Sequence, residues 1–151
     1  MGDQEKSSEK KQSNDIVQGT CLCGDVHYEI AGNLGVFQYC HCSRCRKFTG
    51  SAHGANLLVA PTDFTWTAGE SKVGRFEHGD AKHFATSFCQ RCGSSLPWLT
   101  QSGKAVVVPA GSLDDHPGIE PMHNIYYASR ASWYQNVDDL VCYDELPTKK
   151  Q

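Results

Sequence analysis

Seven of the eight cysteines in this 151-residue chain fall into three tight groups. Two groups are pairs and one is a triplet, so the sulfurs divide into a set of four and a set of three. Four thiolates complete the tetrahedral shell of a zinc ion, whereas three leave one position open for water or a substrate. The grouping therefore predicts one zinc that stabilises the fold and a second zinc that reacts. The groups are Cys21 and Cys23; Cys40, Cys42 and Cys45; and Cys89 and Cys92.

The two pairs are expected to form the structural site. Cys21 and Cys23 lie in a strand-like segment, where residues i and i+2 project from the same face. Cys89 and Cys92 have the spacing of a zinc knuckle, and Gly93 allows the positive φ that such a turn often needs. A shared zinc would then join the first strand to the middle of the chain. The alternative is a different partition, in which one pair serves the triplet.

The triplet is expected to form the reactive site. Its three thiolates fall within six residues and suit one soft cation. Three thiolates give less negative charge than four, so the bound zinc would be the better Lewis acid. Three cations flank the triplet and would either attract an anionic ligand or only solvate the loop. They are Arg44, Arg46 and Lys47.

The sequence leaves the fourth ligand of the triplet open. His41, inside the triplet, and His53, in "TGSAHGAN", are two candidates for a closed Cys3His site. Neighbours of a ligand in a turn usually point away from the metal, which counts against His41. The favoured interpretation is an open or water-bound position, because only that arrangement leaves room for a substrate.

Composition and charge narrow the class of protein. The chain is 39% hydrophobic and 21% charged, which is typical of a soluble globular protein. The formal net charge of −3 argues against a nucleic-acid partner, because such proteins usually carry a basic face. No apolar run approaches the roughly 18 residues of a membrane span. The polar N-terminus lacks a secretory signal. We therefore expect a cytoplasmic protein, in which reduced thiols favour zinc over disulfides.

The elements that position the cysteines are expected to be short strands. Residues 16–147 are predicted to form one mainly β domain, between a disordered polar tail at 1–15 and a short tail at 148–151. No segment keeps a helical period over 12 residues. Alternating segments separated by glycine-containing turns predict strands. They are "GTCLCGDVHYEIAG", the two flanks of the triplet in "FQYCHCSRCRKFTGSAHGANLLVA", "DFTWTAG", "SKVGRFEHG", "KHFATSFC" and "KAVVVPAGSL", with "MHNIYYAS" and "WYQNV" as later strand or turn material.

Several other residues carry simpler expectations. Phe88 and Trp98 are expected to pack over the structural zinc, and Cys142 to lie in the core as a small apolar residue. Asp114 and Asp115 lie in a Gly/Pro-rich stretch and are expected to initiate a turn rather than act as an acid–base pair. The late aromatics are expected to fill a core or line a pocket, with no assigned role. They are Trp133 and Tyr134.

Five separated motifs together resemble one known family. They are "GTCLCGDVHYEI", "YCHCSRCRKFTGS", "FCQRCGSSLPW", "PAGSLDD" and "HNIYYASRASWYQ". In this order they are similar to the glutathione-dependent formaldehyde-activating family, which includes the domain of centromere protein V. The resemblance covers about residues 17 to 147, nearly the whole expected domain.

The resemblance implies a β-tent fold of small antiparallel sheets with two zinc ions. It implies a structural zinc on the two cysteine pairs, a labile zinc on the triplet, and a carbon–sulfur lyase that joins formaldehyde to glutathione as S-hydroxymethylglutathione. Glutathione is anionic, so Arg44, Arg46 and Lys47 would be its docking charges. Some members act on other small substrates or none. Two alternative functions stay open, a non-catalytic zinc module that binds a protein partner and a zinc or thiol sensor.

Overall fold

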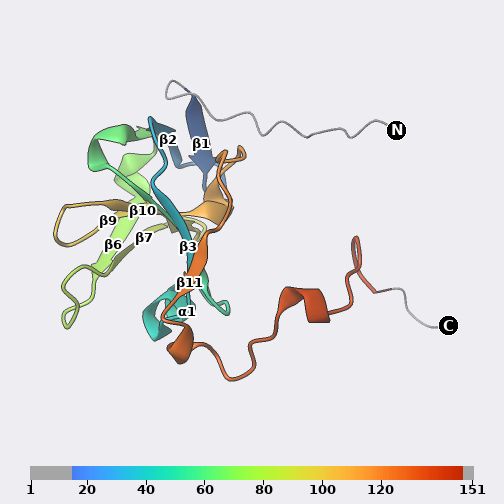
Figure 1. The fold of residues 1–151 in the computed structure, drawn as a ribbon. Coiled ribbons are helices and arrows are strands. Elements are labelled where there is room, and N and C mark those ends of the chain that lie inside the picture. The colour runs from blue at the N-terminus through green and yellow to red at the C-terminus, as the bar shows by residue number, and fades with distance from the viewer. Residues whose placement is uncertain (1–14, 148–151) are drawn as a thin grey trace.

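The computed structural model describes residues 15–147 and has eleven strands, one α-helix and five 3-10 helices (Figure 1). The strands form three small sheets, of three, five and three strands. The mainly β fold class is confirmed. The predicted tails at 1–15 and 148–151 lie outside the described residues, apart from residue 15. None of the helices in the described part is long and apolar enough to cross a membrane.

The first sheet has the order β1-β2-β5 and is antiparallel. Its β1 and β2 form a hairpin where the sequence predicted one strand, because the turn between them carries the first cysteine pair. Gly19 faces Tyr28 across the hairpin, and a Cβ there would collide with the buried Tyr28 ring. The strands are β1 Ile16–Thr20, β2 His27–Ala31 and β5 Phe64–Ala68.

The central sheet has the order β11-β3-β4-β10-β9 and holds most of the core. Its β11 runs parallel to β3, while the other pairs are antiparallel. Buried side chains of β3, β4 and β10 pack on those of β2, so this sheet covers the first. The strands are β3 Val36–Cys40, β4 Gly54–Val59, β9 Trp98–Leu99, β10 Val106–Pro109 and β11 His123–Ile125.

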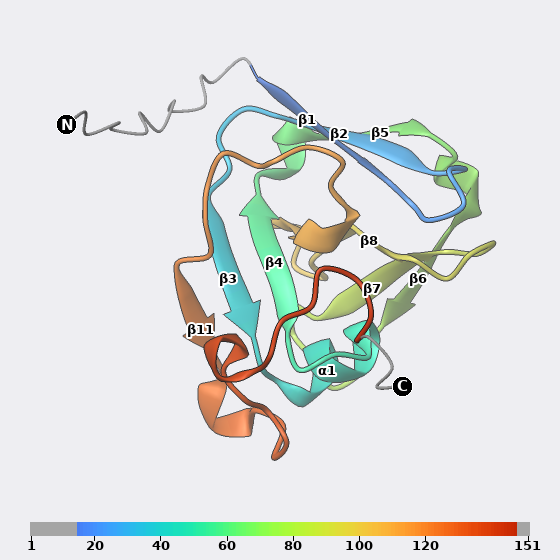
Figure 2. The same ribbon diagram turned by 90° about the vertical axis from the view of Figure 1, so that its right-hand side faces the viewer.

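The third sheet, β6-β7-β8, is antiparallel and ends at the second cysteine pair (Figure 2). The strands are β6 Val73–Glu77, β7 Ala85–Cys89 and β8 Ser95–Leu96. The short 3-10 helices lie in the connections. They are η1 Pro61–Asp63, η2 Glu70–Lys72, η3 Ala110–Ser112, η4 Tyr127–Ser129 and η5 Val137–Asp139.

The α-helix α1, Ser43–Thr49, was not predicted, because seven residues are too few to show a period. It begins after Cys42, whose sulfur accepts a hydrogen bond from the Cys45 backbone N–H at 3.3 Å, and it ends at Gly50 with φ of 63°. This conformation favours glycine at the C-terminal end of a helix. The triplet therefore spans the end of β3 and the first turn of α1.

The placement predicted for Cys142 is wrong, and two other predictions outside the metal sites are refined. Cys142 is exposed rather than buried, because it follows η5 in a C-terminal segment whose residues 135–147 are all exposed. "WYQNV", predicted as strand or turn material, begins in a turn at Trp133 and contains no strand. Asp114 and Asp115 both hold β1, since Asp114 accepts from the Thr20 hydroxyl at 2.5 Å and Asp115 from the Gln18 N–H at 3.0 Å.

Candidate metal centres

The two cysteine pairs meet in space although they are far apart in sequence. The sulfurs of Cys21, Cys23, Cys89 and Cys92 all lie within 4.8 Å of one another. The Cys21 and Cys23 sulfurs are 3.5 Å apart, and the Cys23 and Cys89 sulfurs are 3.8 Å apart. This group, which we call the quartet, could hold one metal ion. The arrangement favours pairing the two cysteine pairs with each other over a partition with the triplet.

The two turns of the quartet have related backbone geometry. Gly24 has a φ of 85° and donates its N–H to the Cys21 carbonyl at 3.1 Å. Gly93 has a φ of 75° and donates to the Cys89 carbonyl at 2.8 Å. Residues with side chains rarely adopt such φ values, so each glycine lets its turn close. The pairs thus converge because each turn folds its sulfurs to one side.

Polar groups around the quartet favour the ionised form of two of its thiols, Cys21 and Cys92. The Val26 N–H donates to the Cys21 sulfur at 3.2 Å. The Ser94 hydroxyl lies 3.1 Å from the Cys92 sulfur, and hydrogen bonding from Ser94 lowers the pKa of that thiol to about 5. Hydrogen bonds to the charged form stabilise it. These two thiols are therefore prepared to act as thiolate ligands.

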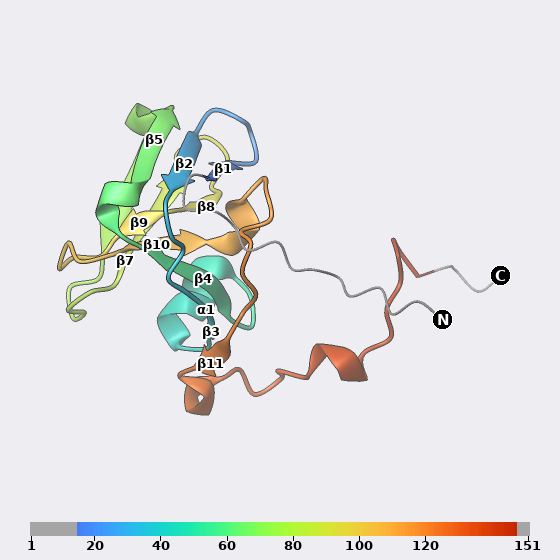
Figure 3. The same ribbon diagram turned by 45° about the horizontal axis from the view of Figure 1, so that its top comes forward.

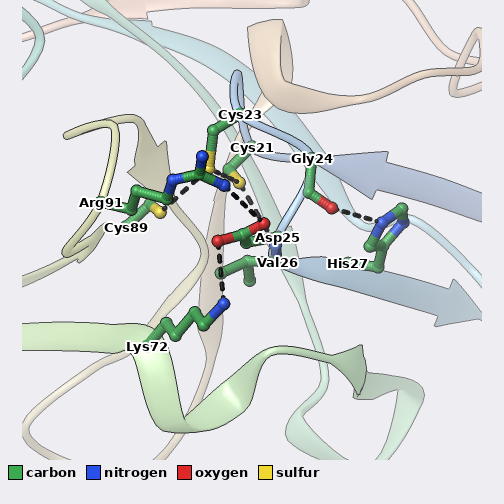
Figure 4. Close-up of polar contacts among 9 residues, drawn as sticks. All are labelled: Cys21, Cys23, Gly24, Asp25, Val26, His27, Lys72, Cys89 and Arg91. Atoms are coloured by element: carbon green, nitrogen blue, oxygen red, sulfur yellow. Dashed lines mark hydrogen bonds and ion pairs between the residues drawn. The ribbon is translucent and has the colours of Figure 1, made fainter.

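Asp25 holds two cations beside the quartet (Figure 4). Its carboxylate accepts from Lys72 at 2.9 Å and from Arg91 at 3.0 Å. These hydrogen bonds hold the pKa of Asp25 below its usual value. Arg91 lies between Cys89 and Cys92 in the sequence. Its pKa is raised mainly by Asp25 and to a smaller extent by the charges of the nearby cysteine sulfurs. The contact thus ties the β1–β2 turn to the second pair and places positive charge near four thiolates.

The apolar packing at the quartet differs from the prediction. Val26 and Leu96 pack on its cysteines, with Trp66 and Val73 at the edge. Phe88 instead lies opposite Gly74 in the third sheet. A Cβ on Gly74 would lie 2.5 Å from the Phe88 ring, so the ring covers this glycine. Trp98 belongs to a separate cluster with Ala85 and Val107, on the side of the triplet. Closeness in sequence to the knuckle misled the prediction, because neighbouring residues of a strand point to opposite faces and Phe88 therefore does not share the face of Cys89.

The triplet forms a second group of sulfurs. Cys40, Cys42 and Cys45 lie within 4.8 Å of one another, and Cys40 and Cys45 are buried. Hydrogen bonds from the other two thiols lower the pKa of Cys42, while contacts with Cys40 and Cys42 raise the pKa of Cys45. Three sulfurs this close cannot all ionise alone, because like charges repel. A soft cation with three thiolate ligands fits this donor set.

No histidine joins the triplet in the described part of the chain. The group of potential ligand atoms there holds the three sulfurs alone. His41 is fully buried and turns away, with Nε2 bonded to Asn124 Oδ1 of β11 at 2.8 Å. His53 stacks on Tyr39 at 4.2 Å between ring centroids, and burial lowers the pKa of this imidazole. The open position favoured by the sequence fits these placements better than a Cys3His site.

Two tyrosines, Tyr127 and Tyr134, pack on the ring of His41. The ring of Tyr134 lies 5.0 Å from that of His41, and the ring of Tyr127 lies 5.1 Å away, both edge-on. Trp133, by contrast, is 67% exposed. Of the two late aromatics, only Tyr134 therefore packs on the residue that separates Cys40 from Cys42. Its contribution is to hold the chain between the ligands in place.

The triplet opens into a pocket of about 660 Å³. Of the three predicted docking cations, only Arg44 lines it. Lys47 lines a neighbouring pocket instead, and Arg46 has a buried Nε without a hydrogen-bond partner. Two basic residues to which the sequence assigned no role also line the triplet pocket. They are Lys82 and His83, from the connection between β6 and β7.

Tyr126 also lines the triplet pocket and has unusual backbone geometry. Its φ is 50° and its ψ is 36°, and it is the one non-glycine residue with positive φ among residues 15–147. Such a conformation costs a bulky residue about 1 to 2 kcal/mol, so the surrounding structure must impose it. The turn after β11 thus directs the chain along the pocket rim.

Comparison with known proteins connects this geometry to a family. The model of a family described as glutathione-dependent formaldehyde-activating enzyme matches residues 16–129. The chain belongs to this family. The match contains both the quartet and the triplet, together with the side chains that line the triplet pocket. The resemblance read from the five motifs is confirmed.

Two individual proteins are similar to the chain. A protein of Halomonas elongata, provisionally named a glutathione-dependent formaldehyde-activating enzyme, is 25% identical over 115 residues, which cover 74% of this chain and 73% of that protein. A crystal structure of a Rhodobacter sphaeroides protein matches with a TM-score of 0.54 and 24% identity, over 71% of this chain and 98% of the other. The second likeness supports the fold.

Metal content and stability should separate the two clusters. We expect Cys89→Ser to lower metal content and to unfold the protein at a much lower temperature, because the quartet joins two sheets. Cys42→Ser should lose one metal ion per chain with a small change in melting temperature. The measurements are elemental analysis of zinc and thermal unfolding by circular dichroism. Cys142→Ser is the matched control, since its thiol is exposed. Equal melting temperatures for Cys89→Ser and Cys42→Ser would contradict this division.

Loss of the Asp25 contact should weaken metal binding at the quartet. Asp25→Asn removes the anion that holds Lys72 and Arg91, so these cations no longer offset the thiolate charge. We expect about a tenfold loss of affinity, at the low end of what supporting contacts around a metal contribute. Competition with a chromophoric zinc chelator measures it. The control is Asp80→Asn, in the exposed β6–β7 connection, and an equal loss in both variants would remove the role of Asp25.

Proposed function

We propose that the chain is a zinc-dependent carbon–sulfur lyase that forms or cleaves S-hydroxymethylglutathione, with the reaction in the triplet pocket. The observation that carries this proposal is the triplet itself, three sulfurs within 4.8 Å at the wall of a pocket and no fourth ligand residue among residues 15–147. The family supports glutathione as the thiol.

Cys40, Cys42 and Cys45 would hold the metal, and Cys21, Cys23, Cys89 and Cys92 the structural ion. When bound at the triplet, zinc supplies a Lewis acid that lowers the pKa of a thiol and polarises a carbonyl oxygen. Asn56 steadies this ligand set, because its Nδ2 lies 3.7 Å from the Cys45 sulfur. His41, between Cys40 and Cys42 in the sequence, also helps to hold the ligands in place, because its side chain is hydrogen-bonded to Asn124.

The reaction in this pocket is a balanced addition. The glutathione sulfur bonds to the formaldehyde carbon, the carbonyl π bond breaks, and the thiol proton ends on the new hydroxyl, with no change of oxidation state overall. His83 is the lining side chain suited to carry that proton, because the two ring nitrogens of an imidazole can accept and donate a proton. Ser102 orients its ring, with Oγ 2.9 Å from Nδ1.

The pocket cations suit an anionic thiol. Arg44 and Lys82 line the pocket and attract the carboxylates of a tripeptide. Trp98 and Phe84 supply an apolar wall that limits water around the reacting sulfur. Arg46 and Lys47, the other predicted docking residues, lie outside this lining and act at most on the approach of the substrate.

The lyase proposal is tested by the rate of adduct formation. We expect Cys42→Ser to lose about 100-fold or more of the protein-dependent rate at equal zinc, because a Lewis acid contributes several kcal/mol to the transition state. The measurement is two-dimensional NMR exchange between glutathione and its adduct, with the spontaneous rate subtracted. Cys142→Ser is the control with full activity. Equal rates with native protein and Cys42→Ser would remove the lyase proposal.

The role of Lys82 is tested by comparing two thiols. We expect Lys82→Ala to raise KM for glutathione about threefold to fivefold with kcat retained, because an exposed ion pair contributes up to about 1 kcal/mol. KM for 2-mercaptoethanol, which has no carboxylate, should not change. Lys104→Ala, another exposed lysine, is the matched control. An equal rise for both thiols would exclude carboxylate recognition by Lys82.

A further inference from the structure

The C-terminal segment of the described chain is an exposed apolar arm. We define the arm as residues 135–147, all of which are exposed. Figures 1 and 3 both show this segment standing away from the sheets. Five of its large apolar side chains are more than half exposed, which is unusual for a segment without a partner. They are Val137, Leu140, Val141, Tyr143 and Leu146.

The charged side chains of the arm are all acidic. Between residues 135 and 147 the sequence has four carboxylates and no lysine, arginine or histidine. A partner for this arm must therefore offer both apolar surface and positive charge. The four carboxylates are Asp138, Asp139, Asp144 and Glu145.

One groove on the same molecule has these two properties. It has a volume of about 530 Å³ and lies between α1 and the β6–β7 hairpin. Phe48, Phe76 and Phe84 line it, and Phe76 is 57% exposed. Arg44, Lys47 and His78 line it too, with no acidic residue among its lining side chains.

A rival apolar groove fits the arm less well. It lies beneath Phe64 and Trp66 and has a volume of about 380 Å³. Its lining includes Glu70 as well as Arg75, so it offers no net positive charge to four carboxylates. Charge complementarity therefore selects the groove at α1, which we call the phenylalanine groove.

We propose that the arm of one copy of this chain docks in the phenylalanine groove of a second copy. The arm leaves the body on the right in Figures 1 and 3, whereas the β6–β7 hairpin lies on the left in both. The arm of a chain thus points away from its own groove. Reciprocal exchange of two arms gives a closed two-fold dimer.

The proposed contact lies beside the candidate reactive site of the partner. Ser43, Arg44 and Phe84 line both the phenylalanine groove and the triplet pocket. A docked arm would therefore cover one side of the wall that the two hollows share. The proposal does not depend on the lyase activity, because it rests on the charge and exposure of the arm and groove.

The test is the mass of the native protein in solution across a range of concentrations, by light scattering and sedimentation equilibrium. We expect a dimer. In Leu140→Ser/Val141→Ser the dissociation constant should rise about 100-fold or more, because two apolar side chains leave each of the two arm contacts. Phe76→Ser should also weaken the dimer, and Leu99→Ser, at the rival groove, should not. High salt should weaken the native dimer by screening the charges.

Mixing the two weakened variants identifies the direction of docking. The Phe76→Ser copy keeps its arm and the Leu140→Ser/Val141→Ser copy keeps its groove, so a mixed dimer should form through one intact contact. Unchanged circular dichroism and zinc content show that each variant folds. A native protein that stays monomeric overturns the proposal. So does a dimer that survives the arm substitutions, or one that Leu99→Ser weakens and Phe76→Ser does not.

Discussion

Repulsion between crowded sulfurs is the constraint on which the rest of this structure depends. Seven thiols occupy two clusters whose members lie within 4.8 Å of one another. Such clusters cannot ionise fully unless a cation lies among them. The quartet joins the β1–β2 hairpin to the end of β7, so the arrangement of two sheets follows from satisfying that charge. In small zinc domains the binding free energy of such a site is folding free energy.

The quartet and triplet differ in their surroundings as well as in their number of sulfurs. Around the quartet, Asp25 with Lys72 and Arg91 supplies a charge network at the surface, and Val26 and Leu96 seal the inner side. On one side of the triplet, the hydrogen bond between His41 and Asn124 holds the chain in place. On the other side, the three sulfurs line a pocket. A site with three sulfurs and an accessible fourth position suits exchange of a ligand, whereas four sulfurs complete the shell of an ion and suit its retention.

The sequence predicted the strands well because alternation and glycine turns are local signals. It also predicted the two sulfur groups, since spacing of one or two residues decides whether neighbouring thiols point together. Helix α1 was not predicted, because seven residues are too few to show a helical period. The role of Lys82 and His83 was not predicted either, because only the fold brings the β6–β7 connection close to Cys42. Cys142 was misplaced for a different reason. An apolar run such as "LVCYDEL" indicates burial, but it does not tell whether the same chain or another one provides the cover.

The parallel pairing of β11 with β3 has a consequence for the order in which the chain assembles. His123 reaches Gln38 across 85 residues, whereas Cys23 reaches Cys89 across 66. During synthesis the quartet is complete as soon as Cys92 has left the ribosome, so a nascent chain can lock its first sheets while the triplet still lacks Tyr126 and Ile125 beside it. A ribosome-bound intermediate could thus hold a metal ion at the quartet before the triplet pocket is complete.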